Sequence, residues 1–138
     1  MSKTHRYAEF SALPNTYSYA YKDPYLDIGL SPDKPIVVEL GCGSGAYTRR
    51  LATTHPHSQY VGIDMKSDRL HFGAKYCAEH GITNAKRLCS SVDHIDNCFA
   101  HESIDEIRIT FPDPRPTRDR QKLTSPKYQT IYNALMKS

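Results

Sequence analysis

The sequence predicts an α/β fold in which a parallel sheet is flanked by helices. Three observations carry this prediction. The chain has 138 residues, which is room for one domain. Short apolar runs, typical of strands buried on both faces, alternate with segments of helical periodicity. A glycine-rich turn joins the first apolar run to the first helical segment. Strands that alternate with helices favour parallel strands with right-handed connections.

Composition narrows the class of protein. Hydrophobic residues make up 38% of the chain and charged residues 24%, which argues against a disordered or fibrous chain, and no apolar run approaches the ~20 residues of a membrane helix. The first six residues lack the apolar stretch of a signal peptide. The four cysteines form no C-x-x-C pair that would indicate zinc or a redox dithiol, and we interpret them as buried thiols: Cys42, Cys77, Cys89 and Cys98. We therefore expect a soluble, cytoplasmic protein without a metal site.

Residues 1–34 form a predicted N-terminal arm, and residues 35–138 form the predicted main domain. The arm holds five of the ten tyrosines, its charges cancel, and its periodicity is weak. Tyrosines can stack on unpaired bases, but a neutral segment lacks the positive charge that such binding uses. We expect an irregular arm that packs over the sheet.

The main domain divides into alternating elements. Residues 35–40 form an apolar run that ends in glycine and predict a first strand, and residues 46–54 predict a helix. A second apolar run predicts a strand over 59–64. The following segment, 67–80, predicts a helix that ends at Gly81, where a left-handed residue is expected. Residues 84–89 predict a weaker third strand.

The last elements surround a basic loop. Residues 104–111 predict a fourth strand, with Ile107 and Ile109 on one face. Ser125 and Pro126 are typical of a helix start, and an apolar stripe at helical spacing follows, formed by Tyr128, Ile131, Tyr132 and Leu135. The sequence therefore predicts a final helix that lies on the sheet.

The basic loop accounts for the net charge of the chain, which is +3. Residues 112–127 hold four of the nine prolines, which disfavour a helix or strand interior, and five basic residues: Arg115, Arg118, Arg120, Lys122 and Lys127. Such a segment could neutralise the phosphates of a nucleic acid. Charge alone favours a solvated loop, because blocks of like charge are often only solvated.

The glycine-rich turn indicates a nucleotide-type ligand. Gly41, Gly43 and Gly45 let the backbone approach a ligand closely, although a tight turn alone would also explain them. Asp64 ends the next strand 19 residues later, where an acid that binds ribose hydroxyls is expected. The pattern also fits dinucleotide sites. Glu39 would repel a pyrophosphate there, but it would favour the sulfonium and ammonium groups of S-adenosyl-L-methionine.

Three motifs resemble the tRNA (guanine-N7)-methyltransferase family. They are Val38-Glu-Leu-Gly-Cys-Gly-Ser-Gly45, Val61-Gly-Ile-Asp64, and Ile109-Thr-Phe-Pro-Asp-Pro114 followed by Lys122-Leu-Thr-Ser-Pro126. The resemblance covers about 100 residues, from Ile36 to Leu135, and its Phe-Pro-Asp-Pro element is far more specific than the glycine loop. It implies a class I methyltransferase sheet, Rossmann-like and three-layered α/β/α. It also implies methyl transfer from S-adenosyl-L-methionine to N7 of a guanosine in the tRNA variable loop.

The resemblance also implies roles for single residues. Glu39, Asp64 and the three loop glycines would bind the cofactor, and Asp113 would be the active-site carboxylate. Ser91 takes the place of the residue that contacts the adenine end, unless a register shift puts Asp93 there. We expect tRNA phosphates to contact basic residues of the loop, namely Arg115, Arg118, Arg120 and Lys122.

The chain departs from the family pattern in two ways. Arg115 replaces the usual aromatic residue after the second proline, and Thr117 stands where a basic residue is usual. The last strands of the family's sheet are also missing. A partner chain or a homo-oligomer could cover the incomplete edge, or the chain could be a truncated or non-catalytic module that binds S-adenosylmethionine or tRNA. Besides the methyltransferase and the non-catalytic module, a nicotinamide-dependent oxidoreductase is a third functional alternative.

Overall fold

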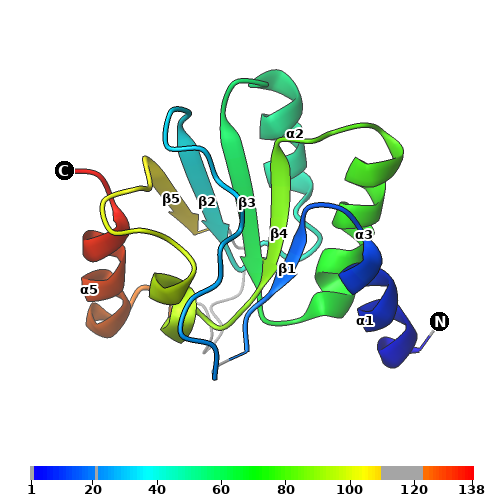
Figure 1. Ribbon diagram of the computed structural model, residues 1–138, viewed down its shortest axis with the longest axis horizontal. Coiled ribbons are helices and arrows are strands. Elements are labelled where there is room, and N and C mark those ends of the chain that lie inside the picture. The colour runs from blue at the N-terminus through cyan, green and yellow to red at the C-terminus, as the bar shows by residue number, and fades with distance from the viewer. Residues whose placement is uncertain (1, 21, 110–122) are drawn as a thin grey trace.

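The sheet has five parallel strands in the order β1-β4-β3-β2-β5 (Figure 1). A computed structural model describes residues 2–20, 22–109 and 123–138. The strands are β1 (Thr16–Ser18), β2 (Ile36–Leu40), β3 (Gln59–Asp64), β4 (Ala85–Cys89) and β5 (Glu106–Ile109). The α/β parallel sheet predicted from the sequence is confirmed.

Helices cover both faces of the sheet and give three layers. They are α1 (Lys3–Ala12), α2 (Ala46–Thr54), α3 (Ser67–Glu79), the 3₁₀ helix η1 (Val92–Asn97) and α5 (Pro126–Leu135). Figure 1 shows α1, α2 and α3 on one side, and η1 and α5 on the other, with the two chain ends on opposite sides of the molecule. The bounds of α2 and β3 are those predicted, and Gly81 follows α3 with the expected positive φ of +66°.

Each face of the sheet has its own core. The larger cluster lies on the side of η1 and α5, where Tyr128, Tyr132 and Leu135 are buried and Ile131 is half-buried. Two smaller clusters lie on the side of α2 and α3, around Tyr60 and Leu70. Every residue of β3 is buried, which confirms that this apolar run is a strand covered on both faces.

The N-terminal arm is only partly irregular: its first half forms α1 and β1, which corrects the expectation, whereas its second half has no helix or strand among the described residues. The hydroxyl of Ser2 accepts a hydrogen bond from the His5 N–H (3.1 Å) and caps α1. Phe10 is fully buried and packs against Leu70 of α3, while β1 pairs with β4 in the sheet. The weak periodicity has a physical reason, because Phe10 is the one buried residue among the side chains of α1 that the structure describes.

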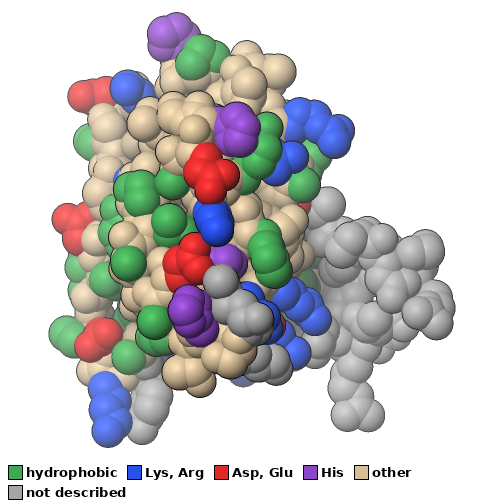
Figure 2. All heavy atoms as spheres, turned by 90° about the vertical axis from the view of Figure 1, so that its right-hand side faces the viewer, with side chains coloured by type: hydrophobic (Ala, Val, Ile, Leu, Met, Phe, Trp, Pro, Cys, Tyr) green, Lys and Arg blue, Asp and Glu red, His purple; other side chains and the backbone are tan. Residues whose placement is uncertain are grey.

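Ion pairs attach the arm to α3. Glu9 lies 3.1 Å from the His71 ring and 3.4 Å from Lys75, and the hydrogen bond from His71 lowers the pKa of Glu9. Figure 2 shows acidic and basic side chains interspersed over the side of the molecule where α1 and α3 lie. The described residues on this side therefore form no single-sign patch of the kind that attracts a polyanion.

The cysteines differ in burial, which corrects the expectation that all four are buried. Cys77 and Cys98 are buried, whereas Cys42 and Cys89 are half-buried, and all four are free. Burial raises the pKa of Cys98 to about 12, so this thiol stays uncharged at neutral pH. Cys42 and Cys89 are more exposed because they follow β2 and end β4, at the edge of the sheet where loops begin.

The far edge of the sheet is β5. Among the described residues β5 pairs with β2 alone, and Ile104 forms an isolated bridge with Met136. The predicted strand over 104–111 is shorter in the structure, and its last two residues lie outside the described part. Within that part, no helix is both long and apolar enough to cross a bilayer.

Candidate cofactor site

Three segments predicted to bind a nucleotide meet at the carboxyl ends of β2, β3 and β4. Glu39 is one residue before the end of β2, and Asp64 ends β3. The N–H of Cys42 donates to the Ile63 carbonyl (3.1 Å), and the N–H of Ser90 donates to the Asp64 carbonyl (3.0 Å). These backbone bonds bring the glycine loop, Asp64 and the segment after β4 to one edge. Ligands of parallel α/β sheets bind at this edge.

The loop from Gly41 to Gly45 has a backbone that favours glycine. Gly41, Gly43 and Gly45 all have φ between +61° and +76°. A Cβ added at Gly43 would have no atom within 4 Å, so this residue borders open space. An open backbone at this place fits a ligand that approaches the loop closely.

Glu39 supplies a nearly buried carboxylate, with 5% of its surface exposed. Its Oε1 accepts a hydrogen bond from the hydroxyl of Thr48, in the first turn of α2. Among the described residues, no other side chain pairs with this carboxylate. A buried carboxylate with one hydrogen bond fits a cationic ligand group, because a buried charge is costly unless an opposite charge lies beside it.

Asp64 holds the loop with its own carboxylate. One oxygen accepts from the Gly43 N–H (3.0 Å) and the other from the Lys66 N–H (3.1 Å). Each carboxylate oxygen has a further lone pair, so Asp64 can also accept hydrogen bonds from two ribose hydroxyls. These residues therefore fit both ends of S-adenosylmethionine, a cation near Glu39 and a ribose near Asp64.

Ser91 and Asp93, the two alternatives for the adenine contact, are bonded to each other. The Ser91 hydroxyl donates to the Asp93 carboxylate (3.1 Å) and accepts from the Asp93 N–H (3.2 Å), which caps η1. Asp93 also pairs with Lys127 (3.0 Å). The hydrogen bonds from Lys127 and Tyr128 lower the pKa of Asp93 to about 2. Lys127, the last basic residue of the segment 112–127, is therefore paired with an acidic side chain of the protein itself, Asp93.

Two buried residues near the site are absent from the sequence prediction. Thr48 bonds to Glu39, and Arg87 lies in the middle of β4 with 1% of its surface exposed. Thr48 carries no signal in the sequence. Arg87 does carry a signal in the sequence, since it interrupts the apolar alternation between Ala85 and Cys89 in the weakest predicted strand.

The remaining predicted site residues lie outside the described residues. They are Asp113, Arg115, Arg118, Arg120 and Lys122. Within the described part of the chain, no cluster of three or more histidine, cysteine or acidic side chains could hold a metal ion.

Solved structures share this fold. The chain superposes on a 16S rRNA (adenine(1408)-N(1))-methyltransferase from Catenulisporales acidiphilia that carries its cosubstrate SAM, with a TM-score of 0.63 and 23% identity over 79% of this chain and 54% of that one. It also resembles a SAM-dependent methyltransferase from Aquifex aeolicus, with a TM-score of 0.59 and 19% identity over 75% and 53% of the two chains. At these identities the likeness establishes the class I methyltransferase fold.

Sequence comparisons identify the family. Residues 33–138 match the family model described as "Putative methyltransferase". The chain is 38% identical over 104 residues to the tRNA (guanine-N(7)-)-methyltransferase of Porphyromonas gingivalis, which covers 75% of this chain and 43% of the relative. It is 29% identical over 147 residues to the tRNA (guanine-N(7)-)-methyltransferase of Bacteroides fragilis. This alignment covers 99% of this chain and 58% of the relative.

The chain spans about half the length of the curated relatives it matches. The alignment with the Bacteroides fragilis protein extends over the N-terminal arm as well as the main domain. The family, predicted from the sequence, is confirmed by these comparisons. The chain belongs to the tRNA (guanine-N7)-methyltransferase family.

Proposed function

We propose that this chain binds S-adenosylmethionine and transfers its methyl group to N7 of a guanosine in the tRNA variable loop. One observation carries the cofactor part. The Asp64 carboxylate holds the N–H of Gly43, next to the nearly buried Glu39. The tRNA part rests on the relatives' names and on the Phe-Pro-Asp-Pro motif. We also propose a cytoplasmic location, since tRNA modification of this kind takes place where tRNA matures.

The residues of the site would position the reactants rather than move protons. S-adenosylmethionine held by Glu39, Asp64 and the glycine loop would supply an electrophilic methyl group, whose bond to sulfur would break on transfer to guanine N7, with S-adenosylhomocysteine as the leaving group. Guanine N7 has a free lone pair and no proton to lose, so no strong base is required. Asp113 would accept hydrogen bonds from the guanine N–H groups and offset the positive charge that the ring gains.

Ser91 is the better candidate for the adenine contact. The Asp93 carboxylate already bonds to three side chains of the protein, Ser91, Lys127 and Tyr128, which leaves it less free for a ligand than Ser91. The Ser91 hydroxyl has two lone pairs and uses one, so it can still accept a hydrogen bond from the adenine amino group. We therefore assign this contact to Ser91.

The basic loop would hold the phosphates of tRNA. Arg115, Arg118, Arg120 and Lys122 supply the positive charge for this role. Replacing Arg118, Arg120 and Lys122 with glutamine should weaken binding of all tRNAs alike and reduce the salt dependence of the affinity. An unchanged slope of log Kd against log salt would remove them from the interface.

A non-catalytic module that binds S-adenosylmethionine or tRNA is the alternative. Glu39 and Asp64 suffice for such a module.

Strand β5 has an unpaired edge within the described residues. An exposed strand edge favours association, so we propose that a second copy or a partner chain covers β5. Measuring the molar mass of the protein in solution checks this point.

Transfer of a labelled methyl group to unmodified tRNA tests the function. The expected product is 7-methylguanosine, found after the nucleosides are separated. Asp113→Ala should abolish the label while S-adenosylmethionine still binds, and Asp119→Ala, an acid of the same basic segment, is the matched control. Bound cofactor without any label would support the alternative. Binding of NAD in preference to S-adenosylmethionine would contradict both.

A further inference from the structure

Arg87 lies under the glycine loop, on the protein side. Its side chain projects from β4 toward α3, and its Nη2 donates to the Gly45 carbonyl (3.1 Å) and contacts the Cys77 sulfur (3.7 Å). Among the described residues, no carboxylate forms an ion pair with Arg87, and its Nε has no hydrogen-bond partner. In the part of the chain that the structure describes, this guanidinium, in a residue with 1% exposure, therefore has neutral partners alone: the carbonyls of Gly45 and Lys86 and the Cys77 sulfur.

Gly45 leaves space that this side chain fills, and two further glycines, Gly73 and Gly62, lie along it. A Cβ at Gly45 would lie 2.6 Å from the Arg87 Nε, and a Cβ at Gly73 would lie 3.1 Å from its Nη2. At Gly62, in β3, a Cβ would first meet the Cys42 Sγ at 2.9 Å, with the Arg87 Cδ in ordinary contact at 3.5 Å. The loop, the central strand and α3 thus all lack a side chain where Arg87 passes.

Stability does not explain a buried arginine at this position. Arginine stays charged, and a buried charge without an anionic partner is costly. Replacing buried ionic groups with apolar residues of similar volume is often neutral or stabilising. The hydrogen bond from Arg87 to Gly45 is therefore the contact in which we look for a functional reason for burying this arginine.

The Gly45 carbonyl stands at the junction of the loop and α2. It accepts from the Arg49 N–H (2.9 Å), which starts α2, and from Arg87. Gly45 is also the last glycine of the loop, two residues after Gly43, which is bonded to Asp64. Arg87 thus fixes one end of the loop from below, while Asp64 fixes its middle from the ligand side.

We propose that Arg87 is a positioning residue, which holds the glycine loop in the conformation that binds the cofactor. It does not touch the cofactor itself. This inference rests on the proposed binding of S-adenosylmethionine at the loop. The effect of Arg87 on the loop conformation, however, can be measured without a ligand.

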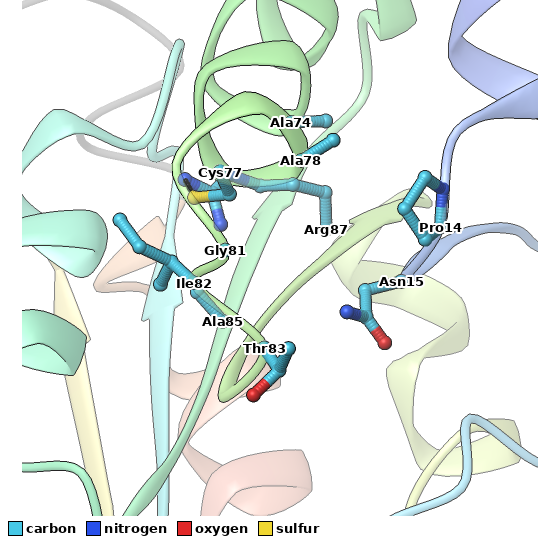
Figure 3. Close-up of a pocket in the computed structure, with 10 residues that line it drawn as sticks. All are labelled: Pro14, Asn15, Ala74, Cys77, Ala78, Gly81, Ile82, Thr83, Ala85 and Arg87. Carbon is cyan, nitrogen blue, oxygen red and sulfur yellow. Dashed lines mark hydrogen bonds between the residues drawn. The ribbon is translucent and has the colours of Figure 1, made fainter.

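A cavity beside Arg87 makes a direct experiment practicable. It has a volume of about 100 Å³ and lies between α3, the start of β4 and the turn at Pro14 and Asn15. Figure 3 shows Arg87 and Cys77 on its wall. Truncation of Arg87 to alanine would enlarge this cavity, and a small guanidinium compound could then enter.

The first experiment compares Arg87→Met with Lys86→Met, the matched control. Lys86 is the neighbouring residue of β4, and its ammonium lies near Asn15 and Tyr17 (3.5 Å each), away from the loop. Arg87→Met should weaken S-adenosylmethionine binding about tenfold in calorimetry, the effect of one lost charged hydrogen bond. Its melting temperature without ligand should equal or exceed that of the wild type. A lower melting temperature with unchanged affinity would show a merely structural role and overturn the proposal.

The second experiment reads the loop directly, by amide hydrogen exchange in the ligand-free protein. Protection of residues 42–46 should fall about tenfold in Arg87→Ala and not in Lys86→Met, and ethylguanidinium should restore it. If the wild type binds no S-adenosylmethionine but exchange still shows this pattern, the proposed function fails and the role of Arg87 in the loop stands. Unchanged exchange in Arg87→Ala, or no rescue, would refute it.

Discussion

Replacing Gly73 with alanine is a sharp test of how α3 meets the glycine loop, because helix propensity and packing predict opposite signs. Gly73 lies inside α3, where alanine should stabilise the helix by about 1 kcal/mol. In the structure, however, a Cβ at Gly73 would lie 1.6 Å from the carbonyl oxygen of Ser44 in the loop. Real Cβ atoms essentially never come closer than 3.0 Å, so the helix and the loop must separate by at least 1.4 Å (3.0 − 1.6).

The magnitude follows from this overlap. The obstructing atom belongs to the backbone, so no side-chain rotation relieves the contact. Overpacking costs about 1–3 kcal/mol, and a backbone clash of this depth belongs at the upper end. After the gain in helix propensity, we expect a net loss of about 2 kcal/mol, which is about 8 °C in melting temperature for a domain of this size. S-adenosylmethionine should also bind about tenfold more weakly, because the loop is displaced.

Thermal and urea unfolding of Gly73→Ala provide the assay, and cofactor binding by calorimetry accompanies them. Ala78→Gly is the control, since Ala78 is exposed on the same helix and this change should cost only the propensity term of about 1 kcal/mol. A Gly73→Ala protein that is more stable than the wild type would refute the packing of the loop against α3.

Two further substitutions test the site from other directions. Thr48→Val keeps the shape of the side chain but removes the donor to Glu39, and should lower the free energy of unfolding in urea by about 1–3 kcal/mol; an unchanged value would show that the bond contributes nothing. Lys127→Met should raise the pKa of Asp93 from about 2 toward 3.8, as followed by carboxyl NMR. Because the folded-state pKa is depressed, the ion pair contributes stability above about pH 4 that is lost as the pH falls toward 2. A titration of Asp93 that does not move would contradict the pairing.

The central elements could be predicted because their burial is simple. The run 59–64 is covered on both faces, so its four inner residues, 60–63, are apolar or glycine, and the strand β3 has the predicted bounds. Gly81 marks the end of α3 because its backbone has a positive φ. Glu39 and Asp64 could be placed at one edge, since the carboxyl ends of parallel strands meet there.

The arm and the segment after β4 could not be predicted, because their order comes from tertiary contacts. Helix α1 is held by Phe10 and by ion pairs to α3, which no local pattern shows. The short η1 depends on the cap by Ser91. The choice between Ser91 and Asp93 likewise depends on Lys127, 34 residues further along the chain.

The glycine motif shows that glycines of one loop can have different structural causes. In the sequence, Gly41, Gly43 and Gly45 all suggest close approach of a ligand. In the structure, only the missing Cβ of Gly43 borders open space. The missing Cβ of Gly45 leaves room for Arg87 on the opposite side of the loop. A side chain at Gly43 should therefore obstruct the cofactor, whereas one at Gly45 should displace Arg87 and disturb the loop even when no cofactor is bound.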